Sequence, residues 1–398
     1  MDKKRIETGP EAGISGPMTQ ALVLGAGIVG SVIAADLAAD GWQITVADRD
    51  PAALAKAQRL AGGTLTTETL DLADPARIGA LAGGFDLVLG ALPGHLGLAA
   101  LRAVIEAGTD CCDISFMPED ARQLDELAQQ HGVTAVVDMG VAPGLSNLLC
   151  GHAVAMFDEC RRLRIQVGGL PADPRPPFEY KAAFSPIDVI EEYVRPARYV
   201  KGGALNTVPA LSQLEIVELP GVPPLESFLT DGLRSLADTL SVPHMEEKTL
   251  RYPGHARLMH AFREAGMFDA EPIEVDGVSV RPIDVTTAGL FPRWTYEEGE
   301  ADLTVMRVEA DGMLGGVEGA IQWDLLDHAD LERGFSSMAR TTAFPCTLVA
   351  RAIRDGTIST KGVLVPEALA TDAVLLERIL DGLSERGVVV TTGSPTPS

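Results

Sequence analysis

The sequence has no apolar run that approaches the roughly 18 residues needed to cross a membrane. Its first residues are charged and then rich in glycine and proline, without the apolar segment of a secretory signal. We expect residues 1–18 to form a disordered leader that precedes the folded part of the chain.

Cysteine is scarce, with five in 398 residues, and no two have the Cys-x-x-C spacing. An odd number of thiols without that spacing favours reduced, structural cysteines and a cytoplasmic location. The sequence also lacks the ligand spacing of a zinc site, the Gly-x-Ser-x-Gly turn of hydrolases and the lysine of a Walker phosphate loop. We therefore expect no metal and none of those chemistries.

Positive charge is also in short supply. The sequence has 32 lysines and arginines but 56 aspartates and glutamates, which gives a net charge of -24. A surface of this sign disfavours binding to nucleic acid or to an anionic membrane. We expect the partner to be a small molecule.

An apolar run at residues 22–24 leads into a Gly-x-Gly-x-x-Gly turn, and a helix pattern follows to about residue 40. In a dinucleotide site the first glycine allows a tight turn and the second lets the backbone approach the pyrophosphate. The third lets helix and strand pack closely, and the helix N-terminus attracts the phosphates. We expect this turn to bind the cofactor through Gly25, Ala26, Gly27, Ile28, Val29 and Gly30.

A second β-branched run ends in Asp48, at the distance from the glycines where an acid accepts hydrogen bonds from the adenosine ribose. Its charge would repel a 2′-phosphate, so Asp48 favours NAD over NADP. Arg49 could bind such a phosphate by turning inward, although an arginine here more often flanks the adenine.

Strand and helix patterns alternate through the first third of the chain with short links. This predicts an α/β fold, a doubly wound parallel sheet of the Rossmann type. Ligands of such sheets bind beyond the carboxyl ends of the strands. We therefore expect further cofactor contacts from Asp71, Leu92, Pro93 and Ser115.

Beyond residue 142 strands mix irregularly with helices, which predicts an inserted α+β domain with an antiparallel or mixed sheet. The predicted division is a dinucleotide-binding domain at 19–142, a second domain at 143–338, and C-terminal helices at 339–398 that return to the first domain.

Several segments together resemble the saccharopine dehydrogenase-like family, most closely its lysine 6-dehydrogenase branch. They are DMGVAPGLSN from residue 138, VGGLP from 167, PPFEY from 176, TLRYPGH from 249, DGTI from 355 and GVL from 362. The resemblance implies a Rossmann domain, an inserted domain for substrate binding and dimerisation, and hydride transfer at a C–N bond. It also implies a homodimer or a homotetramer.

The resemblance bears on the cofactor as well. Saccharopine reductases of the family usually lack an acid at the position of Asp48 and use NADP, whereas the lysine 6-dehydrogenase branch has the acid and uses NAD. The implied reaction is NAD-dependent oxidative deamination of a side-chain amine, with lysine as the first candidate substrate. Relatives commonly have an aromatic residue after the position of Pro93, where this chain has Gly94, which we expect to open the pocket wall.

Amine oxidation requires a proton acceptor, because the nitrogen lone pair must be free before hydride leaves. The resulting iminium is stabilised by a nearby carboxylate. Asp113 and Asp138, both at predicted strand ends, are candidates for that role, although aspartates there often only cap a helix. His95 is the candidate proton acceptor, with a helix-start role as its alternative.

The substrate's own charges call for further residues. An amino-acid carboxylate is best bound by an arginine, and Arg251 in the TLRYPGH segment is the candidate, followed by His255. Arg251 could instead form an ion pair between domains. Glu179 and Tyr180, in the PPFEY segment, are candidates for binding the ammonium group.

Three functions remain open at this point. The first is an NAD-dependent amine dehydrogenase, and the second is a saccharopine-forming or opine-type imine reductase. The third is an NAD-binding sensor or scaffold without turnover. The charged residues in the substrate loops disfavour the third, because a sensor has no need of them.

Overall fold

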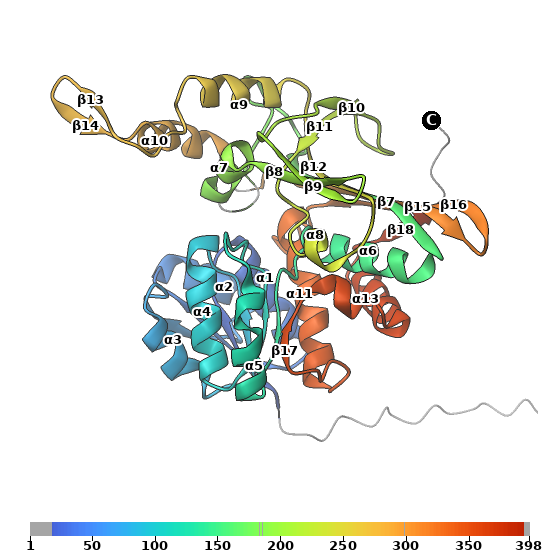
Figure 1. Ribbon diagram of the computed structural model, residues 1–398. Coiled ribbons are helices and arrows are strands. Elements are labelled where there is room, and N and C mark those ends of the chain that lie inside the picture. The colour runs from blue at the N-terminus through green and yellow to red at the C-terminus, as the bar shows by residue number, and fades with distance from the viewer. Residues whose placement is uncertain (1–17, 183, 185, 298, 394–398) are drawn as a thin grey trace, which may run out of the picture.

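The computed structural model describes residues 18–182, 184, 186–297 and 299–393. It contains two large sheets with helices around them (Figure 1). The predicted leader lies outside the described residues, except for Met18 at its end.

The first sheet has seven strands: β1 (Gln20–Leu24), β2 (Gln43–Asp48), β3 (Thr66–Thr69), β4 (Leu87–Gly90), β5 (Asp110–Asp113), β6 (Thr134–Val136) and β17 (Gly362–Leu364). All pairs are parallel, in the order β17-β6-β5-β4-β1-β2-β3. The order reverses between β1 and β4, which is where ligands of such sheets bind. The predicted doubly wound parallel sheet is thus confirmed.

Helices cover both faces of this sheet because its strands bury side chains on both sides. The helices that follow its first five strands are α1 (Ile28–Ala39), α2 (Pro51–Leu60), α3 (Pro75–Ala82), α4 (Gly94–Glu106), the 3-10 turn η1 (Ala121–Leu124) and α5 (Asp125–His131). Asp50 and Asp74 cap α2 and α3 at their N-termini, and each is followed by a proline.

The second sheet has nine strands: β7 (Glu159–Pro171), β8 (Ala197–Lys201), β9 (Ala204–Val208), β10 (Glu215–Val217), β11 (Leu225–Leu229), β12 (His244–Arg251), β15 (Asp302–Leu314), β16 (Val317–His328) and β18 (Val390–Gly393). β12 pairs with β7 in parallel, and the other described pairs are antiparallel. The predicted mixed sheet is confirmed. Helices α6 (Leu145–Met156), α7 (Pro186–Val194), α8 (Leu236–Thr239), α9 (His255–Glu264) and α10 (Pro282–Trp294) accompany it.

The last part of the chain joins both sheets. Helix α11 (Ser337–Arg354) packs against α1, and Arg351 pairs with Asp36 on α1 at 3.0 Å. After α11 come β17 in the first sheet, α12 (Pro366–Leu369), α13 (Ala373–Glu385) and β18 in the second sheet. The two strands were not expected, and the predicted domain boundaries stay a prediction.

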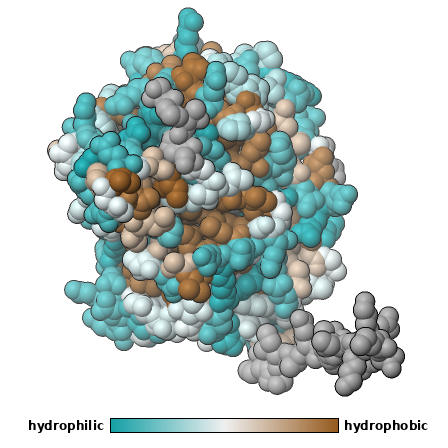
Figure 2. Space-filling model, turned by 90° about the vertical axis from the view of Figure 1, so that its right-hand side faces the viewer, coloured by the Kyte–Doolittle hydropathy of each residue, from teal (hydrophilic) through white to brown (hydrophobic). Residues whose placement is uncertain are grey.

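A hairpin of β13 (Ile273–Val275) and β14 (Val278–Val280) projects from the second sheet's side of the molecule (Figure 1). On the face shown in Figure 2, apolar side chains gather between the upper and lower parts, and hydrophilic ones surround them. Within the described part of the chain, no helix is long and apolar enough to cross a membrane.

Candidate functional site

A cavity of about 430 Å³ lies where the two sheets meet, and both contribute to its walls. The first sheet's side supplies the glycine turn and the loops after β4 and β5. The second side supplies β7, α7, the loop after β11, and β12. The residues that line it include Gly27, Gly30, Ala91, Leu92, Pro93, Phe116, Asp188, Glu191, Glu192, Arg195, Thr230, Asp231, Gly232, Glu247, Thr249 and Arg251.

The three glycines have the geometry that a dinucleotide requires. Gly25 has φ +102°, and a Cβ on it would lie 2.5 Å from the carbonyl oxygen of Ala91. A Cβ on Gly30 would lie 2.1 Å from the carbonyl oxygen of Gly25, so only glycine lets α1 start this close to the turn. Nothing lies within 4 Å of the corresponding position at Gly27, which leaves the backbone open to a pyrophosphate. These residues fit a nicotinamide dinucleotide.

Asp48 lies at the end of β2 beside this turn. Its Oδ2 accepts a hydrogen bond from the N–H of Ala26 at 2.7 Å, and its Oδ1 accepts one from Asp50 at 2.8 Å. Arg49 is exposed. Asp71, after β3, is exposed and accepts a bond from the N–H of Ala73, so it shapes its own turn and does not line the cavity.

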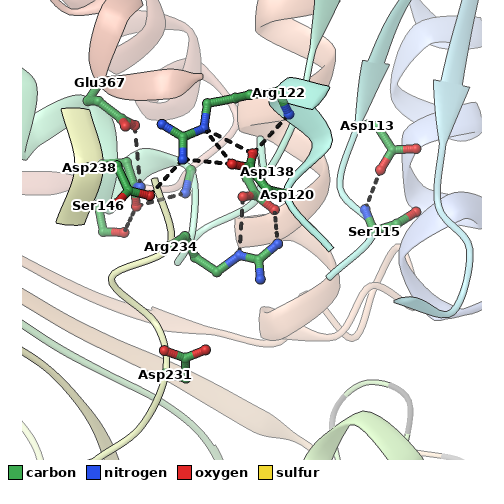
Figure 3. A network of polar contacts seen from close by, with 12 residues as sticks. Asp113, Ser115, Asp120, Arg122, Asp138, Ser146, Asp231, Arg234, Asp238 and Glu367 are labelled. Carbon is green, nitrogen blue, oxygen red and sulfur yellow. Dashed lines mark hydrogen bonds and ion pairs between the residues drawn. The ribbon is translucent and has the colours of Figure 1, made fainter. Parts of the chain in front are cut away.

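Asp113, the first candidate for iminium stabilisation, is buried and does not line the cavity. Its Oδ1 accepts a hydrogen bond from the N–H of Ser115 at 2.6 Å, as Figure 3 shows. Burial raises the pKa of Asp113 to about 6, against the lowering effect of the Ser115 hydrogen bonds. The Ser115 hydroxyl accepts a bond from the N–H of Leu92 at 3.3 Å. Asp113 and Ser115 thus hold the loop whose residues Leu92 and Pro93 line the cavity.

Asp138, the second candidate, also points elsewhere. It has φ +53° and forms an ion pair with Arg234 at 3.2 Å (Figure 3). The Arg234 guanidinium lies 4.6 Å from the centre of the Phe116 ring, and Arg195 lies 5.1 Å from the same ring. Asp138 does not line the cavity, and its role beside an iminium stays a prediction. Its pair with Arg234 positions Phe116, which lines the cavity.

The expectation that Gly94 opens the wall is wrong. Gly94 is buried, and a Cβ on it would lie 2.1 Å from the carbonyl oxygen of Phe116. The backbone of Phe116 fills the space, and its ring supplies an aromatic surface to the cavity. His95 is exposed on the first turn of α4 and does not line the cavity, so it is not in place to accept a substrate proton.

Arg251 lines the cavity from the end of β12, although only 2% of its surface is exposed. One terminal nitrogen bonds a carboxylate oxygen of Glu192 at 2.5 Å, and the other bonds the carbonyl of Leu250 at 2.9 Å. Its Nε is buried and has no hydrogen-bond partner among the described residues. The guanidinium lies 4.6 Å from the centre of the Tyr180 ring. Arg251 therefore places a positive charge at the cavity wall, although its Nε is out of reach of the cavity.

The remaining predicted substrate residues lie behind Arg251. His255 is fully buried, with Nδ1 2.9 Å from the carbonyl of Phe178 and Nε2 2.9 Å from the Tyr193 hydroxyl. Burial, helped by the charge of Arg251, lowers the pKa of His255 to about 3. It is therefore neutral, donating from Nδ1 and accepting at Nε2. Tyr180 is buried beneath Arg251, and neither Tyr180, Glu179 nor His255 lines the cavity.

The second wall contains charged residues that the sequence analysis missed. On β12, Glu247, Thr249 and Arg251 alternate on the face toward the cavity. Recognising Arg251 on a strand would have placed the other two by the two-residue period. Four charged lining residues lie on α7 or just after it: Asp188, Glu191, Glu192 and Arg195. Their spacing of three and four residues places them on one face of a helix, and this pattern is visible in the sequence.

Glu247 is the most deeply buried of the acidic residues on this wall, with 4% of its surface exposed. Its Oε2 accepts a hydrogen bond from the Thr230 hydroxyl at 2.5 Å, and Thr230 lies 2.8 Å from the Thr249 hydroxyl. A Cβ on Gly232 would lie 2.3 Å from the Glu247 carboxyl carbon. Burial raises the pKa of Glu247 to about 8. Among the described residues, no group of three or more His, Cys, Asp or Glu side chains could hold a metal ion.

Comparison with protein families finds two adjacent matches. The saccharopine dehydrogenase NADP binding domain matches residues 21–136, and the saccharopine dehydrogenase C-terminal domain matches residues 140–388. Together they cover the cavity and both sheets except β18 and the first residue of β1.

Curated relatives include alpha-aminoadipic semialdehyde synthase, mitochondrial, of Bos taurus, which is 24% identical over 80% of this chain and 42% of its own length. The chain thus spans about two fifths of the length of that relative. The NADP(+), L-glutamate-forming saccharopine dehydrogenase of Schizosaccharomyces pombe is 23% identical over 87% of this chain and 92% of its own length.

A solved structure shares the fold. It is the apo L-Glu-forming saccharopine dehydrogenase of Saccharomyces cerevisiae, with a TM-score of 0.78 at 21% identity. The match covers 95% of this chain and 100% of that one.

Proposed function

Since the chain belongs to the saccharopine dehydrogenase family, we propose that it is a nicotinamide-dependent oxidoreductase acting on a C–N bond of a lysine-derived amino acid. One observation carries the proposal: the glycine turn and the buried Arg251 line the same cavity. The turn is suited to the cofactor's pyrophosphate, and the guanidinium charge of Arg251 is suited to an amino-acid carboxylate.

Within this class we propose the side-chain amine of lysine as the group oxidised. The described cavity wall has five acidic side chains, Asp188, Glu191, Glu192, Asp231 and Glu247, against the two guanidiniums of Arg195 and Arg251. Both arginines already have a carboxylate partner. This balance favours a substrate with two amines and one carboxylate.

A saccharopine-type reaction is the second candidate. The relatives named above as saccharopine dehydrogenases favour it. Its substrate joins lysine to glutamate and carries three carboxylates, which a wall with two paired arginines would bind less well.

The side chains present have separable roles in such a reaction. Arg251 would bind the substrate carboxylate, and Glu192 beside it would bind the α-ammonium group. Leu92, Pro93 and Phe116 supply apolar surface that excludes water from the reacting carbon. A bound nicotinamide would accept or donate the hydride.

We further propose NAD as the preferred cofactor. Asp48 lies beside the turn, where its charge disfavours a 2′-phosphate, and Arg49 is exposed. The relative from Schizosaccharomyces pombe is named for NADP(+), so the cofactor has to be measured for this chain.

The direct test is turnover of an amine panel with NAD and with NADP, monitored at the nicotinamide absorbance. We expect lysine-dependent reduction of NAD, release of ammonia, and the reverse reaction only with ammonia. Saccharopine oxidation with release of glutamate would favour the second candidate. Cofactor binding without turnover of any amine would contradict the enzyme proposal.

We also propose that two copies associate, and the β13–β14 hairpin supports this. Cross-strand pairing places Ile273, Val275, Val278 and Val280 on one face, and the first three are exposed. An isolated two-stranded hairpin is at best marginally stable in water, so an apolar face on it favours a covering partner. The expected apolar sheet interface has less support, because cross-strand ion pairs such as Arg164–Glu246 and Arg307–Asp324 lie on the outer sheet face.

Light scattering at low and high salt tests this assembly. We expect a dimer or a dimer of dimers in both, because an apolar contact is not screened by salt. A Val278→Glu change should give monomers, and a monomeric unaltered protein would contradict the proposal.

The five free cysteines, all buried, support the proposed cytoplasmic location.

A further inference from the structure

Glu247 is a buried carboxyl group at the cavity wall whose described surroundings supply hydrogen bonds but no cation. The Thr230 hydroxyl and the backbone N–H of Gly232 are its donors. The other acids discussed above are engaged: Glu191 pairs with Arg195 at 3.4 Å, and Asp231 pairs with Arg198 at 2.6 Å. A lone buried carboxyl is costly to ionise, so it is suited to exchanging a proton with a ligand.

We propose that Glu247 is the catalytic proton acceptor for the substrate ammonium group, an inference that rests on the proposed function. In the oxidation, an N–H bond of the ammonium breaks and the proton forms an O–H bond on Glu247. The freed nitrogen lone pair then forms the C=N bond as the carbon's hydride passes to the oxidised nicotinamide. In the reverse direction, Glu247 returns the proton to the amine.

Position separates Glu247 from the other proton acceptors considered. Asp113 and His95 do not line the cavity, and Asp138 is paired with Arg234. Glu192 also lines the cavity and burial raises its pKa too, but its Oε2 is bonded to Arg251, which opposes that shift and occupies the oxygen. Glu247 lies four residues before Arg251 on the same strand face, so an amino acid anchored at Arg251 can extend along β12 toward it.

The groups around Glu247 shift its pKa in opposite directions. The carboxylates of Glu192 on α7 and Asp231 in the loop after β11 raise its pKa, while its hydrogen bonds lower it. Arg251, on the same strand as Glu247, forms its ion pair with Glu192. The residue opposite Glu247 on β7 is the apolar Ile165. With a pKa of about 8, Glu247 is mostly protonated at pH 7 until a cationic ammonium approaches. A proton is then released on binding, and the carboxylate is left ready to accept one.

The experiment compares Glu247→Gln with Glu246→Gln, its neighbour on the opposite strand face, using the best substrate of the amine panel. We expect Glu247→Gln to lower kcat/KM by about 10²- to 10⁴-fold, the usual contribution of a general base. In the unaltered enzyme kcat/KM should rise tenfold per pH unit up to about pH 8, and this limb should vanish in Glu247→Gln. Glu246→Gln should keep both rate and limb.

A second readout does not depend on turnover. Calorimetry of lysine binding in two buffers of different ionisation enthalpy should detect proton release at pH 7 from the unaltered protein and none from Glu247→Gln. If Glu247→Gln fails to fold, Glu247→Asp should retain the limb at reduced rate.

The outcomes separate this inference from the proposed function. Turnover by the unaltered enzyme with Glu247→Gln retaining a third or more of kcat/KM overturns the role of Glu247 and leaves the function standing. Loss of the pH limb in Glu247→Asp also overturns it. No amine turnover by the unaltered enzyme overturns both.

Discussion

The two walls of the cavity hold their carboxyl groups in different ways. Behind the wall of the first sheet, Asp113 accepts a hydrogen bond from the backbone N–H of Ser115 and Asp138 pairs with Arg234, so both acids shape loops. On the wall of the second sheet, Arg251 and Glu247 line the cavity, and the Glu247 carboxyl group has no cationic partner among the described residues. The acids of the first sheet thus hold the backbone of loops, whereas Arg251 and Glu247 of the second sheet are placed where a ligand can contact them.

The largest expected effect is on substrate binding at Arg251. Arg251→Ala should raise KM for lysine by roughly 30- to 5,000-fold, because losing the partner of a desolvated carboxylate costs about 2–5 kcal/mol. The KM for hexylamine, which has no carboxylate, should change far less. Steady-state kinetics with both amines measures the difference.

A control is needed because removal of Arg251 leaves Glu192 buried without its partner. Arg251→Lys keeps a positive charge beside Glu192 and should lose lysine affinity less than Arg251→Ala. Equal losses for lysine and hexylamine would show that Arg251 does not bind the carboxylate.

The second prediction concerns stability at Glu247. Its folded-state pKa of about 8 lies above its ordinary value of 4.5, so the folded state binds the proton more tightly. The stability linked to this group is fully present below pH 4.5 and is lost as the pH rises through 8. We therefore expect Glu247→Gln, which stays neutral, to be more stable than the unaltered protein at pH 9, by about 5 kcal/mol.

Urea unfolding at pH 5, 7 and 9 checks this, with the difference expected to shrink toward pH 5. Glu246→Gln is the matched control and should show no such trend. A difference that is constant across this range would mean that Glu247 is not the titrating group.

The smallest predicted effect is on the first wall. Asp48→Ala should shift the ratio of kcat/KM for NAD and NADP toward NADP by roughly tenfold, about 1.4 kcal/mol. Because Asp48 also holds the N–H of Ala26, both cofactors should bind somewhat less tightly. An unaltered protein that already prefers NADP would contradict the role assigned to Asp48.

Features that depend on residues close together in the chain could be predicted from the sequence, and those that depend on distant residues could not. The glycine turn and parallel sheet depend on residues close in the chain, and both are confirmed. The role of Asp138 depends on Arg234, 96 residues away, and no local pattern indicates that contact. Glu247 could not be predicted because β12, HMEEKTLR, has polar side chains on both faces, so no apolar–polar alternation marks it as a strand. The short strand β17 has too few residues for any period to appear.

Strand β17 has a consequence for how the protein is made. It pairs with β6, and Thr134 at the start of β6 bonds the carbonyl of Thr360, 226 residues later in the chain. At about 5–20 residues per second, a ribosome needs roughly 11–45 s to supply that partner. Throughout this interval β6 is an open edge, a template for pairing with other nascent chains. Slow translation of the middle of the chain should therefore favour aggregation, whereas factors that cover this edge should favour the native protein.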